Sequence, residues 1–100
     1  MRGASFVWSP LLKKTPRVSH ELYHMSDWLP TFYRLAGGMA DLPDEIDGHD
    51  IWDSLSKGKP SPRDEIVHHI DWTFNEYAIR KGPYKLLLGS GIYVLAPDTW

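Results

Sequence analysis

The strongest constraint on the fold is the stretch from residue 24 to residue 38, which predicts a helix with both ends marked. Ser26 and Asp27 are N-cap residue types, whose side-chain oxygens accept hydrogen bonds from the free N–H groups of a first helical turn. Pro30 falls in that turn, where its missing N–H costs little. The glycine pair 37–38 supplies the left-handed residue that commonly ends a helix. Apolar residues recur at helical spacing at Leu29, Phe32, Tyr33 and Ala36.

This helix is apolar on nearly every side, because Trp28 and Leu35 widen the stripe and leave only Thr31 and Arg34 polar. Such a helix needs cover on more than one face. The chain also carries five Trp, five Tyr and three Phe, which require a large core or an interface. Both features predict packing against a body larger than 100 residues.

The remaining elements are read in chain order. Residues 4–9 predict a buried strand that ends at Pro10, and Asp50 predicts the cap of a short helix over residues 51–56 that Gly58 ends. A rigid linker then follows at residues 59–63 and a strand at residues 64–71. Two further strands at 77–80 and 84–88 form a hairpin around the turn at 81–83, and a turn-rich tail begins at residue 89. The order strand, helix, helix, strand, hairpin predicts an α/β or α+β fold.

Composition excludes several classes of function. The formal charge of -2 and the lack of a basic block argue against nucleic-acid binding. A membrane span needs an apolar run of about 18 residues, and the sequence has none. The absence of cysteine excludes disulfides, thiolate metal sites and cysteine nucleophiles within these residues.

Two histidine pairs are candidates for chemistry. His20 and His24 are four residues apart, as two metal ligands on a helix can be. A cap at Ser26 or Asp27 would place both before the helix, so ordinary surface or hydrogen-bonded histidines are the favoured interpretation. His68 and His69 would point to opposite faces of a strand and could not readily share one ion.

His69 and Asp71 could share a strand face and form a base with its orienting carboxylate, although a polar strand end is the favoured interpretation. Residues 47–50, Asp-Gly-His-Asp, offer oxygen ligands but lack the alternation of a calcium loop, so a turn with an N-cap explains them. The serines lack a nucleophile-elbow pattern; they include Ser5, Ser9, Ser19, Ser26, Ser54 and the Gly89-Ser90-Gly91 loop. The sequence therefore predicts no catalytic, cofactor-binding or metal-binding residue.

Five ordered blocks nevertheless resemble the sulfatase family, and among sulfatases the animal arylsulfatase B (N-acetylgalactosamine-4-sulfatase) group. The resemblance covers about residues 2–93. The blocks begin with Ser-Phe-Val-Trp-Ser-Pro-Leu-Leu and Glu-Leu-Tyr-His-Met-Ser-Asp-Trp-Leu-Pro-Thr-Phe-Tyr-Arg-Leu-Ala-Gly. They continue with Leu-Pro-Asp-Glu-Ile-Asp-Gly-His-Asp-Ile-Trp, Ser-Pro-Arg-Asp-Glu-Ile-Val-His-His-Ile-Asp and Ala-Ile-Arg-Lys-Gly-Pro-Tyr-Lys-Leu-Leu-Leu-Gly.

The resemblance implies a partial alkaline-phosphatase-like α/β sandwich, with residues 1–93 as a post-active-site segment of a sulfatase catalytic domain and residues 94–100 as a truncated tail. It implies a parent that hydrolyses sulfate esters of glycosaminoglycan-type sugars with calcium and formylglycine. A sulfated sugar would be its substrate, and it would be lysosomal or secreted.

The family's nucleophile motif, Cys-x-Pro-Ser-Arg, has no counterpart here, because Lys59 stands where the similar run Lys59–Arg63 would need the cysteine. The family's calcium block and its lysine would lie upstream of Met1. The chain alone is therefore expected to be inactive. A non-catalytic interaction module derived from a sulfatase is the alternative.

Overall fold

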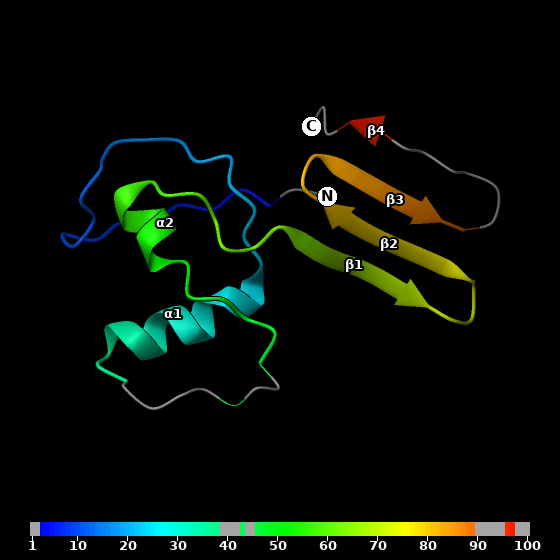
Figure 1. Cartoon of the computed structure of the whole chain (residues 1–100), viewed down its shortest axis with the longest axis horizontal. Coiled ribbons are helices and arrows are strands. Elements are labelled where there is room, and N and C mark those ends of the chain that lie inside the picture. The colour runs from blue at the N-terminus through cyan, green and yellow to red at the C-terminus, as the bar shows by residue number, and fades with distance from the viewer. Residues whose placement is uncertain (1–2, 39–42, 44–45, 90–95, 98–100) are drawn as a thin grey trace. The chain divides into compact units, whose positions relative to one another are not determined.

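The computed structural model describes residues 3–38, 43, 46–89 and 96–97. The chain forms two compact units, and the division falls after Arg63, at the end of the predicted linker. The first unit, residues 3–63, carries the helices and is called the helical unit. The second, from Asp64 onward, carries the sheet and is called the sheet unit (Figure 1).

The predicted central helix forms as a 3-10 turn, η1 (Met25–Asp27), that runs directly into α1 (Trp28–Leu35). Asp27, one of the two predicted cap residues, is the N-cap residue of α1, but its side chain makes no capping hydrogen bond to α1. The side-chain cap forms at η1, where the His24 side chain accepts from the Ser26 N–H while Asp27 accepts from the His24 N–H. This reciprocal arrangement is a capping box that begins at His24, two residues before Ser26. Gly37 follows the helix at a φ of 87°, as a glycine stop requires.

The buried face of α1 differs from the predicted apolar face. Pro30 and Thr31 are the buried residues of this helix, whereas Leu29 and Phe32 are each 59% exposed. Thr31 can be buried because its hydroxyl donates to the Asp27 carbonyl at 2.6 Å and accepts from the Ile51 N–H at 3.0 Å. Ile51 is itself fully buried, so the centre of the helical unit lies between Thr31 and Ile51.

The second helix, α2 (Trp52–Lys57), begins one residue later than predicted, with Ile51 as its N-cap residue, and ends at the predicted Gly58. Asp50 Oδ1 accepts from the Trp52 N–H at 2.9 Å, and Gly58 ends the helix at a φ of 71°. The αL conformation at this position favours glycine because it has no Cβ to clash.

The predicted buried strand at residues 4–9 is wrong. These residues belong to no strand, and Phe6 and Trp8 are 93% and 83% exposed. Strand-forming residues need a neighbouring strand that completes their hydrogen bonds. The described sheet contains β1 to β4 and gives residues 4–9 no such neighbour.

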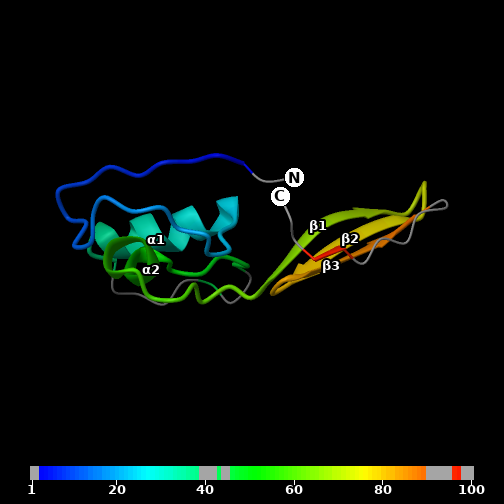
Figure 2. The same ribbon diagram turned by 90° about the horizontal axis from the view of Figure 1, so that it is seen from above.

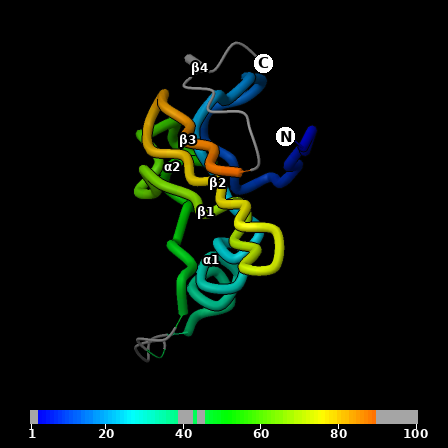
Figure 3. The backbone as a smooth tube through the Cα atoms, turned by 90° about the vertical axis from the view of Figure 1, so that its right-hand side faces the viewer, coloured from blue at the N-terminus to red at the C-terminus, as the bar shows by residue number. Residues whose placement is uncertain are grey.

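The sheet is an antiparallel meander in the order β1-β2-β3-β4, which Figure 2 shows as a single layer and Figure 3 follows along the backbone. Its strands are β1 (Glu65–Asp71), β2 (Glu76–Lys81), β3 (Tyr84–Leu88) and the short β4 (Ala96–Pro97). The first three confirm the predicted strand and hairpin. β4 pairs with β3, a pairing that the sequence did not predict for the tail.

The register places one apolar face on this sheet. A bulge between Val67 and His69 shifts the alternation of β1, so that Val67 and Ile70 lie on the same face. The residues of β2 and β3 that pair with them complete this apolar face, namely Tyr77, Ile79, Leu86 and Leu88. All the described strand pairs are antiparallel, so the parallel core of an α/β sandwich does not appear in the part of the chain described.

Candidate functional site

The most connected polar group in the helical unit is the carboxylate of Asp27, whose residue has no exposed surface. The Arg63 guanidinium donates hydrogen bonds to this carboxylate. Its Nε lies 3.1 Å from Oδ1 and 3.0 Å from Oδ2, and a terminal nitrogen lies 2.6 Å from Oδ1. Only 10% of the Arg63 side chain is exposed. This is a buried ion pair with fork-like geometry.

Two backbone groups complete the surroundings of Asp27. The His24 N–H donates to Oδ2 at 2.8 Å, and the His49 N–H donates to Oδ1 at 2.9 Å. Arg63 also donates to the Asp47 carbonyl at 2.6 Å. Three segments that are distant in the sequence therefore meet at one carboxylate, and we call this arrangement the Asp27 clamp.

Burial alone would raise the pKa of Asp27, because a charge is costly away from water. Hydrogen bonds from Arg63 and from the His49 and His24 N–H groups, together with the Arg63 charge, outweigh burial and hold the pKa below its usual value. The carboxylate is thus ionised at neutral pH and its oxygens are occupied. It acts as a structural clamp, and its oxygens are not available to a metal or a transferred proton.

Next to the clamp, His24 Nδ1 lies 2.8 Å from Ser26 Oγ, which resembles a nucleophile with its base. Asp27 does not complete a triad, because it contacts the backbone N–H of His24 and not the imidazole ring. The same Nδ1 also accepts from the Ser26 N–H at 3.4 Å. The pair is a helix cap, in agreement with the prediction that His24 is a hydrogen-bonded histidine. His20 is exposed.

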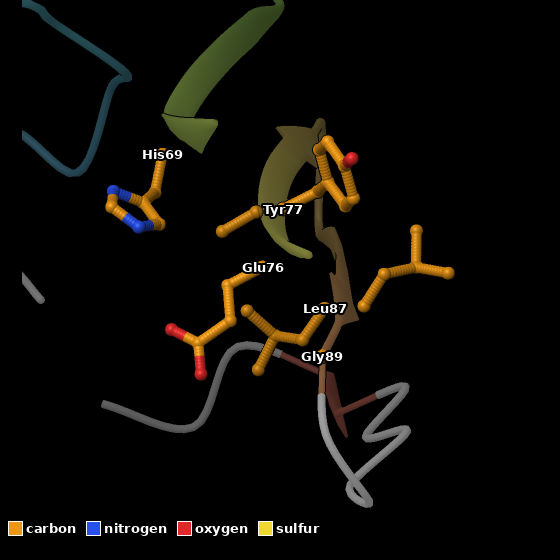
Figure 4. A pocket seen from close by; sticks show the side chains of 7 residues that line it. His69, Glu76, Tyr77, Leu87 and Gly89 are labelled. Atoms are coloured by element: carbon orange, nitrogen blue, oxygen red, sulfur yellow. The ribbon is translucent and has the colours of Figure 1, made fainter. Parts of the chain in front are cut away.

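The sheet unit holds the other histidine cluster. His69 Nε2 and Asp71 Oδ2 are 3.9 Å apart, which is too long for the hydrogen bond of a base and its orienting group. His69, Glu76, Leu87 and Gly89 help to line an open groove of about 300 Å³, into which His69 and Glu76 point in Figure 4. The Tyr77 ring points away on the other side. Half of the His69 side chain is exposed (53%), so the pair fits the favoured interpretation of a polar strand end.

The other sequence candidates have structural roles where they are described. Asp50 accepts from the Trp52 N–H at the start of α2 and pairs with Arg34 at 2.7 Å. Ser54 is buried between the Tyr23 hydroxyl at 2.8 Å and the Lys59 carbonyl at 2.7 Å. Ser90 and Gly91 lie outside the described residues. Over the described ranges, no three His, Asp or Glu side chains are grouped as a metal site.

Sequence reasoning missed Arg63 and Thr31. Arg63 stands in the predicted linker and lies 36 residues from its partner, so no local pattern connects the two. The signal that could have drawn attention to Thr31 is its position as one of the two polar residues in an otherwise apolar helix.

Comparison with known proteins identifies one region of similarity that spans the whole chain. No family model matches the sequence. The chain is 48% identical over 128 residues to arylsulfatase J of Mus musculus, and the alignment covers all of this chain but 21% of that protein. No helix among the described residues is long and apolar enough to cross a membrane. The chain is thus similar along its whole length to about a fifth of a sulfatase.

Proposed function

We propose that this chain is a non-catalytic segment of an arylsulfatase-type sulfuric ester hydrolase. The observation that carries the proposal is the 48% identity along the full chain to about a fifth of arylsulfatase J. The segment would supply packing surface and a rigid frame to the enzyme. Residues 1–93 would belong to the catalytic domain of that enzyme.

The residues present do not fit the two groups that sulfatase chemistry implies. Formylglycine is made from cysteine, and the chain has none. The most buried carboxylate, Asp27, is already occupied by Arg63 and two N–H groups, and Asp50 is occupied by Arg34 and the Trp52 N–H. The nucleophile and a calcium site would therefore come from other parts of the enzyme.

The finer assignment within the proposal is an arylsulfatase B-like enzyme that acts on sulfated glycosaminoglycan-type sugars in the lysosome or outside the cell. It is supported by the five sequence blocks described above, whose order and spacing resemble that group.

The first test is activity. The purified 100-residue chain, supplied with calcium and a chromogenic aryl sulfate, is expected to release no more product than a heat-denatured blank. Turnover above the blank would overturn the non-catalytic assignment, because the reaction would then need a nucleophile among the residues present.

The second test addresses the sulfatase assignment itself. Reading the transcript upstream of Met1 is expected to reveal an in-frame Cys-x-Pro-Ser-Arg motif. A verified start codon at Met1 without that motif upstream would favour the second candidate, a small interaction module. The observation that favours this module is the exposure of Phe6 (93%) and Trp8 (83%), which would then form a binding surface.

A further inference from the structure

Five cationic residues of the helical unit gather around the C-terminal end of α2. Lys57 and Lys59 lie at the end of the helix and just after it, while Lys13, Lys14 and Arg17 belong to a turn far earlier in the chain. Backbone hydrogen bonds hold the two segments together, because the Lys13 and Lys14 N–H groups donate to the Ser56 carbonyl at 3.1 and 3.0 Å. We call these five residues the basic cluster.

Two charged ends of the basic cluster, those of Lys14 and Arg17, lie close to Gly58. A Cβ placed on Gly58 would lie 3.6 Å from Lys14 Nζ and 3.8 Å from Arg17 Cζ. Lys57 and Lys59, its two neighbours in the chain, each place Nζ 2.6 Å from one oxygen of Asp53. The sequence shows no basic block, so the cluster becomes visible only when the two segments are brought together by folding.

The groups around the basic cluster neutralise only part of its charge. Arg17 donates to the Ser54 and Leu55 carbonyls at the end of α2, where the helix carries about half a negative charge. Asp53 pairs with Lys57 and Lys59, whose hydrogen bonds lower the pKa of its carboxyl to about 2 and keep it ionised. One carboxylate and a helix end therefore leave most of the five positive charges uncompensated, in a chain whose formal charge is -2.

We propose that the basic cluster is a binding surface for a sulfated polysaccharide, separate from the site of sulfate hydrolysis. Lysine side chains remain open to solvent there: 41% of the Lys57 side chain and 59% of the Lys59 side chain are exposed. A polymer with regularly spaced sulfates could contact several of these charges at once and release counterions. The choice of sulfate over other anions rests on the proposed function.

The test is binding of the full chain to fluorescently labelled dextran sulfate, measured by anisotropy at about 20 and 150 mM salt, which differ in screening length. We expect binding that weakens with salt, no binding to unsulfated dextran, and weaker binding to an oligothymidylate of equal charge. The variant Lys13→Ala/Lys14→Ala should weaken dextran sulfate binding about 3- to 10-fold, as the loss of two exposed charge contacts predicts. Lys13→Arg/Lys14→Arg should restore it.

The matched control is Lys81→Ala/Lys85→Ala, which removes the same charge from the sheet unit and should leave the affinity within about 2-fold. Equal losses in both double variants would overturn the proposal, as would equal affinity for the oligothymidylate or no binding to dextran sulfate. Circular dichroism of each variant separates lost binding from lost structure. The assay measures binding and not hydrolysis. A lack of binding would therefore leave the proposed function unchanged, and evidence against the proposed function would leave a measured affinity unchanged.

Discussion

At the scale of single residues, the helical unit depends on the Asp27–Arg63 ion pair. Removing one partner of a buried pair is more damaging than losing a surface pair, because the remaining charge stays buried without its counterion. We expect Arg63→Ala to destabilise the helical unit by about 3 kcal/mol. Amide hydrogen exchange should show this as a loss of protection of about 100-fold at the N–H groups of His49 and Ile51.

The matched control for that substitution is Arg34→Ala, which removes the ion pair between Arg34 and Asp50. Its arginine side chain is 75% exposed, so the expected loss is below about 1 kcal/mol. If the two arginine substitutions changed the protection of His49 and Ile51 equally, the Asp27 clamp would not be the special contact that the geometry indicates.

The lowered pKa of Asp27 predicts how the helical unit responds to acid. A carboxyl whose folded-state pKa lies below its unfolded value of about 3.9 contributes stability that is present above that pH. The contribution is lost as the pH falls through the folded-state pKa. The indole N–H resonance of the adjacent Trp28, assigned by NMR, should therefore report loss of structure below about pH 4 in the native chain. Asp27→Asn should be less stable at pH 7 and show a weaker dependence in the acid range. An unchanged acid transition in Asp27→Asn would contradict this assignment.

At the scale of elements, the hairpin between β2 and β3 depends on its two-residue turn. Gly82 has a φ of 54°, and Pro83 fixes its own φ near −65°, so the turn has a positive φ only at its first central residue, as in type II′. Gly82→Ala should destabilise the hairpin by about 1 kcal/mol or more, since a Cβ is strained there. Faster amide exchange in β2 and β3 would measure the effect. Gly3→Ala, in open space, is the control and should change little.

The same scale shows which elements the sequence can predict. α2 and the hairpin carry their own signals, and Gly58 at the helix end and Gly82 in the turn act as expected. Asp50 accepts from the first N–H of α2, although Ile51 is the N-cap residue. The face that α1 buries depends on Thr31 meeting the Ile51 N–H, a contact between distant segments. Residues 4–9 have strand-forming composition but no neighbour in the described sheet. Nearby residues largely determine where a helix or strand begins and ends. The distant segments that pack against the element determine which of its faces is buried.

The candidate site was less predictable than the fold. The sequence correctly placed the His20 and His24 pair before the helix and favoured structural roles for residues 47–50. The Asp27 clamp and the basic cluster both join segments that are separated by long stretches of chain, so spacing rules for helices and strands contain no information about them.

At the scale of the whole molecule, much of the apolar surface is left uncovered. The sheet face formed by Val67, Ile70, Leu86 and Leu88 is between 41% and 53% exposed at these residues, and Leu29 and Phe32 on α1 are each 59% exposed. Stable small domains bury such side chains, because burial of apolar area is the main favourable term in folding. We therefore expect the isolated chain to bind a hydrophobic dye and to melt over a broad temperature range. A sharp cooperative transition in a monomer that binds no dye would contradict this expectation.

Two substitutions locate the source of that dye binding. Leu86→Thr changes a side chain on the open sheet face, where the residue is 42% exposed, and should lower dye fluorescence while the circular dichroism spectrum is retained. Ile66→Thr places a hydroxyl at a residue that is 7% exposed, where an unpaired polar group costs about 1–3 kcal/mol, and should raise dye binding as the sheet unit opens. Opposite responses would trace the exposed surface to the folded sheet. An increase in dye fluorescence in both variants would instead mean that both side chains are buried in the native chain. Other residues of the chain would then cover the sheet face.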